Sequence, residues 1–212
     1  MPRLALLLVL VWFLSLFVLR TVIQWWRTGD AGVRGFSGRV GSLEWNAGAL
    51  ASLGMAAGVL APVVTLAGWP GGTLWFANDA IHIVGALLVA LGIGGALAAQ
   101  ISMGNSWRIG VDARETTAFV TEGLFAWVRN PIFSFILLTG VGLVMLLPTA
   151  FSLLALVLTT AGIEIQMRAV EEPYLEKAHG AAYRDYASRV GRLFPGIGRI
   201  DVHARESGDV AG

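Results

Sequence analysis

The sequence of 212 residues contains no cysteine, a single lysine and only 14% charged residues. Without cysteine the chain has no disulfide framework and no thiolate metal site. The low charged fraction, beside 56% hydrophobic residues, excludes a disordered chain. A soluble domain of this length could not bury so much apolar surface. The formal net charge of +1 gives no reason to expect a nucleic-acid partner. These absences predict an integral membrane protein.

Five apolar segments are candidates for membrane-spanning helices. They are residues 4–23, 43–67, 80–101, 131–147 and 149–165. The first is longer than a signal-peptide core and no small-residue cleavage site follows it, so we interpret it as a span. Only Pro148 separates the last two, which predicts an antiparallel hairpin. A polar helix opened by Glu171, Glu172 and Pro173 is expected to follow on the cytoplasmic side.

The predicted fold is therefore all-α, an integral membrane bundle of about five transmembrane helices with a C-terminal cytoplasmic helix. We divide it into three N-terminal spans (1–101), a core of loop, hairpin and C-terminal helix (102–198), and a flexible tail (199–212). Of the 15 basic residues, Arg3 alone would lie on one side of the membrane. The positive-inside rule then predicts an N-terminus outside and a C-terminus in the cytoplasm. The excess of arginine over lysine is associated with bacterial genomes rich in G and C, so we expect a bacterial inner membrane.

Small and polar residues recur within the predicted spans. Glycines at membrane depth favour close packing of helices; here they are Gly54, Gly58, Gly92, Gly94, Gly95, Gly140 and Gly142. Gln100 fits two interpretations, a hydrogen bond between helices or part of a polar cavity. The three histidines fit no metal-ligand spacing, and we predict no metal site.

Glu164 and Arg168 lie four residues apart at the predicted cytoplasmic end of the last span, so they share a helical face. Charged groups at this depth either pair with one another or line a cavity. Both interpretations remain open on the spacing alone.

Two sequence blocks flank the predicted hairpin. Residues 123–133, GLFAWVRNPIF, are similar to the pattern G-x-[YF]-x-x-x-R-H-P-x-Y, and residues 171–186, EEPYLEKAHGAAYRDY, to E-E-x-x-L-x-x-x-F-G-x-x-Y-x-x-Y. Over about residues 104–198 the chain thus resembles the superfamily of isoprenylcysteine carboxyl methyltransferases and phospholipid methyltransferases. Three positions depart from its pattern: Asn130 replaces histidine, Phe133 replaces tyrosine, and His179 replaces an aromatic residue. Asparagine cannot titrate, so no acid–base role is expected at position 130.

The resemblance implies a methyltransferase that uses S-adenosylmethionine in a pocket facing the cytoplasm, with a lipidic or small hydrophobic acceptor. It implies that Gly123, Leu124, Asn130 and Pro131 line one wall of that pocket. Arg129 would pair with the cofactor carboxylate, Glu171 or Glu172 would accept hydrogen bonds from its ammonium or ribose, and Tyr183 would contact it nearby. The residues expected to act on the acceptor are Arg168, which would orient an anionic group, and Glu164, the candidate base for an amine or thiol.

Two other interpretations remain open. A membrane reductase using NADPH, of the steroid or sterol reductase type, is similar at the C-terminal helix, and a non-catalytic scaffold would fit the loss of the histidine at position 130. The sequence leaves open the acceptor's identity, methylation on oxygen, nitrogen or sulfur, and the oligomeric state.

Overall fold

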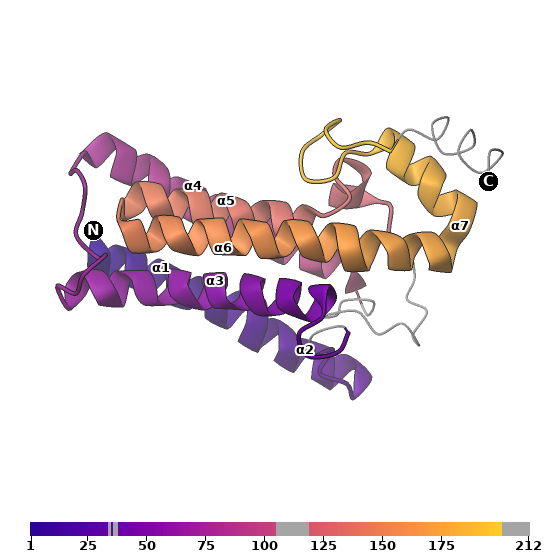
Figure 1. The fold of residues 1–212 in the computed structure, drawn as a ribbon, viewed down its shortest axis with the longest axis horizontal. Helices are drawn as coiled ribbons and strands as arrows, with labels where there is room; N and C mark the ends of the chain where they lie inside the picture. The colour runs from indigo at the N-terminus through magenta and orange to yellow at the C-terminus, as the bar shows by residue number, and fades with distance from the viewer. Residues whose placement is uncertain (34, 36–37, 105–118, 201–212) are drawn as a thin grey trace.

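The computed structural model describes residues 1–33, 35, 38–104 and 119–200. Long helices lie side by side along one axis of the molecule (Figure 1). In chain order the elements are α1 (Pro2–Phe13), the π-helix η1 (Leu14–Leu19), α2 (Arg20–Thr28), α3 (Leu43–Leu66), α4 (Asp79–Ser102), the 3₁₀ turn η3 (Gly123–Ala126), α5 (Pro131–Leu146), α6 (Ala150–Gln166), the π-helix η4 (Met167–Glu171) and α7 (Glu172–Arg189). The described residues form isolated bridges and no strand, so the all-α prediction is confirmed.

Four helical stretches are long and apolar enough to cross a membrane. They are Pro2–Thr28, Leu43–Leu66, Asp79–Ser102 and Ala150–Arg189, the last apolar only in its first part. The fifth predicted span is α5, which has 16 residues and is shorter than the others. Proline limits it at its start, where Pro131 is the first helical residue. The chain is an integral membrane protein with four to five apolar helices.

The helix predicted to open at Glu171, Glu172 and Pro173 is α7, whose first residue is Glu172, but no break in the backbone precedes it. Instead α6 continues without interruption through η4 into α7. The π-helical stretch Met167–Glu171 comes just before Pro173, whose missing N–H disturbs the ordinary α-helical pattern. The sequence changes from apolar to charged at this point, but the backbone stays helical.

The chain bends within α7, at Gly180. This residue has φ +52° and ψ −124°, a conformation that side-chain-bearing residues rarely adopt. Figure 1 shows the second half of α7 turning back toward the bundle after this bend. The bend therefore directs the segment after α7 onto the end of the hairpin.

The helices pack as two close pairs, with α5 against α4 and α6 against α3. Glycine allows both approaches: a Cβ at Gly92 would overlap the α5 backbone at Phe135, and one at Gly54 would overlap the backbone nitrogen of Thr159. The packing prediction was wrong for Gly94, where a Cβ would meet nothing within 4 Å. That glycine lies on the exposed face of α4.

The side chain of Gln100 makes a hydrogen bond between two helices. Of its two interpretations, a hydrogen bond between helices or part of a polar cavity, the structure supports the first. Its Nε2 donates to the carbonyl oxygen of Leu16 in η1 over 3.2 Å, and both groups are buried. The buried Arg20 lies beside them and donates to the carbonyl oxygens of Gly104, at 2.8 Å, and Gln100, at 3.4 Å. The first helix is thus attached to α4 by polar contacts at one end of the bundle.

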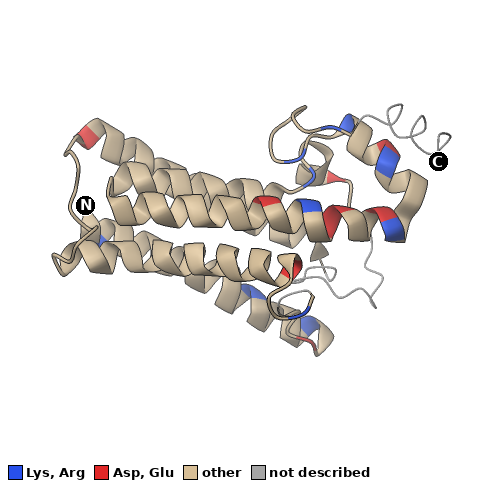
Figure 2. Cartoon of the chain, viewed as in Figure 1, with Lys and Arg blue, Asp and Glu red and all other residues tan. Residues whose placement is uncertain are grey.

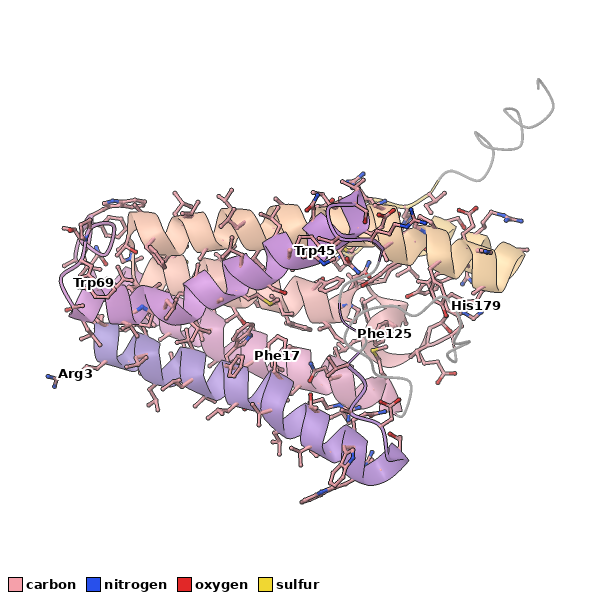
Figure 3. The ribbon with its side chains drawn as sticks, turned by 60° about the horizontal axis from the view of Figure 1, so that its bottom comes forward. Arg3, Phe17, Trp45, Trp69, Phe125 and His179 are labelled. Carbon is pink, nitrogen blue, oxygen red and sulfur yellow. The ribbon has the colours of Figure 1, made fainter. Side chains whose placement is uncertain are left out.

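Charged residues gather at the end of the molecule that carries α7 (Figure 2). The opposite end carries Arg3 and Trp69, whereas Phe125 and His179 lie at the charged end (Figure 3). Some residues used for the orientation prediction lie outside the described residues, as does most of the predicted tail, from residue 201 on. These are Arg34, Arg108, Arg114 and Arg205.

Candidate functional site

The first sequence block, residues 123–133, meets the segment that follows α7 through backbone hydrogen bonds at the charged end. The N–H of Arg129 donates to the carbonyl oxygen of Gly191 over 2.8 Å, and the N–H of Asn130 donates to that of Arg192 over 3.1 Å. Val128 and Gly191 form a parallel bridge at the same place. The segment after α7 therefore lies alongside the loop that leads into α5.

Glu172 lies between two arginines at the centre of this junction. Its Oε1 accepts from Arg129 Nη2 at 2.8 Å and from Arg192 Nε at 2.7 Å, and its Oε2 accepts from Arg192 Nη2 at 2.9 Å. The exposed fractions of the Arg129, Glu172 and Arg192 side chains are 3%, 15% and 15%. We call these three residues the arginine–glutamate cluster. Short charge-assisted hydrogen bonds in a partly dry setting make it a strong local contact.

Arg129 holds protein groups in addition to Glu172. Its Nη1 donates to the carbonyl oxygens of Ala187 (2.9 Å) and Val190 (2.8 Å), and its Nη2 also donates to that of Gly198 (3.0 Å). Its Nε is buried and has no hydrogen-bond partner among the described residues. Arg129 therefore has one N–H group, on Nε, left for the expected contact with the cofactor. Its other four N–H groups donate to Glu172 and to carbonyl oxygens of the C-terminal segment.

Arg192 is a member of the site that was not predicted from the sequence. Its hydrogen bond to Glu172 raises its pKa above the ordinary value, burial opposes this, and the negative charges of Glu172 and Glu164 add to the increase. The sequence shows Arg192 as one of several arginines after the tyrosines of α7, and no spacing rule connects it to Glu172, 20 residues earlier.

Asn130 and Pro131 form the start of α5. Asn130 occupies the N-cap position and Pro131 the first helical position. The Asn130 side chain donates from Nδ2 to the carbonyl oxygen of Arg192 at 3.3 Å, and Ser134 Oγ donates to that of Leu193 at 2.7 Å. The asparagine that replaces the family histidine thus has a structural contact that needs no titration.

Gly123 and Leu124 lie in the turn that precedes this junction. Gly123 has φ +62°, which favours glycine, and it is exposed. The carbonyl oxygen of Leu124 accepts from the N–H groups of Trp127 and Val128, both at 3.2 Å. The two residues therefore shape the loop, and the half-buried Leu124 side chain is the part of it that could line a wall.

Tyr183 packs in an aromatic group beside the arginine–glutamate cluster. It is 1% exposed and lies with Tyr186 and Phe119, whose ring centroids are 5.2 Å apart. His179 stacks on Phe119, with ring centroids 4.7 Å apart and an interplanar angle of 15°, so its ring makes an aromatic contact. Tyr186 also donates from its hydroxyl to the carbonyl oxygen of Phe125 at 2.6 Å, which joins α7 to η3.

Glu164 and Arg168 form an ion pair of 2.8 Å one helical stretch before the cluster. Both are more exposed than the cluster, at 34% and 61% of their side chains. The structure therefore brings together the two residues that were predicted to act on the methyl acceptor. It also places Glu164 close enough to Arg192 for their charges to interact. Of the alternatives Glu171 and Glu172, the arginines contact Glu172, and Glu171 is half-buried beside it.

The fold and this site define an integral membrane protein of helices with a charged, partly buried site at one end of the bundle. No three histidine, cysteine or acidic residues that could hold a metal ion come together in the described part of the chain. Residues 80–182 match the family model described as phospholipid methyltransferase. This segment therefore belongs to that family, part of the superfamily of integral membrane methyltransferases, and the resemblance is confirmed.

The match begins in α4 and ends within α7. It starts earlier than the resemblance found in the sequence, and it stops one residue before Tyr183. A search of curated proteins finds no match to the chain.

Proposed function

We propose that the protein transfers a methyl group from S-adenosylmethionine to a lipid-like or small hydrophobic acceptor, as isoprenylcysteine carboxyl methyltransferases do. The observation that carries this proposal is the arginine–glutamate cluster, which joins the two sequence blocks of a chain whose residues 80–182 belong to a methyltransferase family.

The residues of the cluster have the chemistry that this cofactor needs. Its amino-acid end carries an ammonium and a carboxylate, so a site for it must present both signs close together. Glu172 offers a carboxylate, Arg129 keeps a buried Nε donor without a partner among the described residues, and Arg192 adds a second cation. Two guanidinium groups and one carboxylate give the cluster a net positive charge, which favours binding of the carboxylate end. Gly123, Leu124, Asn130 and Pro131 would form the wall beside it, with Tyr183 behind Glu172.

The bound cofactor supplies a methyl group on a positively charged sulfur, and the displacement at that carbon needs alignment and a dry setting more than acid–base chemistry. Arg168 would orient an anionic group of the acceptor. A carboxylate acceptor needs no base, whereas an amine or a thiol would lose its proton to Glu164. Because Glu164 and Arg168 lie on the more exposed side of the site, the acceptor would approach from there.

We further propose that the charged end faces the cytoplasm and the N-terminus lies outside, in the inner membrane of a bacterium. The gathering of arginines at the end that carries α7, with Arg3 at the other, supports this orientation (Figure 2). Labelling of single cysteines introduced at each end, in intact and in opened cells, tests it directly because the natural chain has none.

Two titrations and one transfer assay test the function. Purified full-length protein is titrated calorimetrically with S-adenosylhomocysteine and with NADPH, and is incubated with native membrane lipids and cofactor carrying a labelled methyl group. We expect micromolar binding of S-adenosylhomocysteine and a product heavier by one methyl group. Binding of NADPH alone would indicate the reductase instead. Binding of S-adenosylhomocysteine without any labelled product would indicate a non-catalytic scaffold.

A further inference from the structure

A tight turn after α7 presents two apolar residues on the outside of the molecule. Phe194 and Ile197 oppose each other in an antiparallel bridge, and the N–H of Ile197 donates to the carbonyl oxygen of Phe194 at 3.1 Å. Directly opposed residues of such a bridge direct their side chains to the same face. Both residues are exposed, Phe194 at 60% and Ile197 at 66%. We call residues 193–197 the C-terminal turn.

Backbone contacts fix the shape of the C-terminal turn. Pro195 and Gly196 are its central residues, and Gly196 has φ +77°, which a type II turn requires at that position. The N–H of Arg192 donates to the carbonyl oxygen of Ile197 at 2.7 Å. On the other side Gly198 accepts from a guanidinium of the arginine–glutamate cluster at 3.0 Å. The apolar pair is therefore held outward by a turn that both neighbours attach to the cluster.

The C-terminal turn lies beside the membrane-spanning part of α5. Leu193 is buried with the residues of the bundle core, and its carbonyl oxygen accepts from Ser134 Oγ at 2.7 Å. Figure 1 shows the segment after α7 returning beside the start of α5. Ser134 lies 12 residues before Leu146, the last residue of α5. At 1.5 Å per residue this is about 18 Å along the helix.

The other end of α5 marks a membrane boundary. There the N–H of Trp75 donates to the carbonyl oxygen of Pro148 at 2.9 Å, and Trp75 is 54% exposed. Exposed tryptophan is typical of the interface between hydrocarbon and water. A hydrocarbon core of about 30 Å that begins at this boundary extends beyond Ser134. Leu193 and the adjoining Phe194 therefore lie at hydrocarbon depth, Leu193 toward the bundle and Phe194 toward the outside.

A cation lies next to the apolar pair. A Cβ at Gly196 would be 3.5 Å from Arg199 Nη2, so the guanidinium of Arg199 is beside the tip of the turn. Arg199 is exposed, and it forms no ion pair within the part of the chain that the structure describes. Arginine binds phosphate through paired N–H groups, and its stem can rest on apolar chains while its charge reaches the headgroups. The combination suits a phospholipid with an anionic headgroup.

We propose that the C-terminal turn inserts into the bilayer, with Phe194 and Ile197 among acyl chains and Arg199 at the phosphate of an anionic phospholipid. The partner is the lipid of the leaflet at the charged end, bound as a structural contact and not as the methyl acceptor. The inference is independent of the proposed function. It adds a membrane contact that lies well beyond the last apolar helix of the chain.

Fluorescence quenching tests the insertion, and the absence of natural cysteine makes labelling specific. Full-length Ile197→Cys carries a nitrobenzoxadiazole label in vesicles of phosphatidylcholine and phosphatidylglycerol. A nitroxide high on the acyl chain quenches labels in the hydrocarbon, whereas aqueous iodide quenches labels in water. We expect quenching by the nitroxide and protection from iodide. Should Ile197→Cys not fold, the label at Phe194→Cys gives the same readout.

Two exposed positions supply the controls. Lys177→Cys on α7 places the label in water, and Leu91→Cys on α4 places it in lipid. A label at position 197 that iodide quenches as strongly as the one at position 177 overturns the proposal. Protection from both quenchers would show that protein covers the turn, whether a second copy of this chain or another partner, and this also overturns it.

The role of Arg199 is read from the lipid that surrounds the label. The nitroxide is placed on phosphatidylglycerol in one set of vesicles and on phosphatidylcholine in another, at the same total composition. We expect a preference for phosphatidylglycerol of roughly fivefold, which corresponds to about 1 kcal/mol for one arginine at an anionic surface. Arg199→Gln should lower the preference toward one, whereas Arg189→Gln, at an arginine paired with Asp185, should keep it. Equal quenching by the two lipids in the protein that retains Arg199 overturns the assignment of an anionic lipid.

Discussion

Removal of the Glu172 carboxylate should destabilise the protein as well as abolish binding of S-adenosylhomocysteine. Glu172→Ala deletes the acceptor of three charge-assisted hydrogen bonds and leaves two arginines, 3% and 15% exposed, without their counter-ion. Breaking a buried pair from one side costs about 3–5 kcal/mol. The remaining carbonyl contacts of Arg129 and the partial exposure of Arg192 favour the lower end, about 3 kcal/mol.

The assay is thermal unfolding of purified full-length protein, with and without S-adenosylhomocysteine. For a chain of this length, about 3 kcal/mol corresponds to a fall in Tm of roughly 6–12 °C. The ligand should raise the Tm of the unmodified protein and should not raise that of Glu172→Ala. Glu172→Asp keeps the charge on a shorter side chain that cannot reach both arginines, so it should fall between the two.

Asp185→Ala is the matched control, on the same helix. Asp185 pairs with Arg189 at 2.6 Å, as short a distance as any in the cluster, but the two side chains are 68% and 67% exposed. A surface pair of this kind contributes at most about 1 kcal/mol, so Tm should change by no more than roughly 4 °C. An equal fall in Tm for Asp185→Ala and Glu172→Ala would refute the reasoning that burial decides the strength of these pairs.

Three further outcomes follow from contacts elsewhere in the chain. Arg168→Ala should lower turnover and leave the affinity for S-adenosylhomocysteine unchanged. Arg184→Ala, at another exposed arginine, is the control, and equal turnover in the two variants would show that the ion pair of Arg168 with Glu164 is only structural. Gly92→Leu should prevent folding, judged by monodispersity in detergent, because it overlaps the α5 backbone, whereas Gly94→Leu should fold normally. Tyr186→Phe removes one buried hydrogen bond and should cost about 1 kcal/mol, measured as a small fall in Tm; no fall would show that the bond to η3 contributes nothing.

The bundle could be predicted from the sequence because a membrane restricts the possibilities. Backbone polar groups cannot remain unpaired in lipid, so an apolar run of sufficient length is a helix. The apolar segments that form α3 and α4 were predicted to within one residue at each end. The continuity of α6 with α7 was not predicted, because the change from apolar to charged residues marks where the membrane ends and carries no information about where the helix ends. Pro173 indicated a new helix, since it is typical of a first turn, and here a π-helical stretch accommodates it instead.

The members of the candidate site could be named from the sequence, but their mutual contacts could not. The family pattern points to Arg129 and Glu172 one by one, and it assigns both to the cofactor. That the two pair with each other across 43 residues depends on how the hairpin closes and how α7 bends, which no local pattern encodes. Arg192 was missed for the same reason, because its partner is determined by the path of the chain after α7.

The bend at Gly180 explains how these long-range contacts become possible. A straight α7 would carry its second half away from the hairpin, whereas the bend returns it, so that Val190 and Gly198 present their carbonyl oxygens to Arg129. Arg129 comes directly before the Asn130–Pro131 start of α5. The same guanidinium therefore joins a membrane-spanning helix, the acidic side chain of α7 and the C-terminal segment. Since only glycine readily adopts the backbone angles found at position 180, the assembly of the charged site depends on a residue that touches none of its groups.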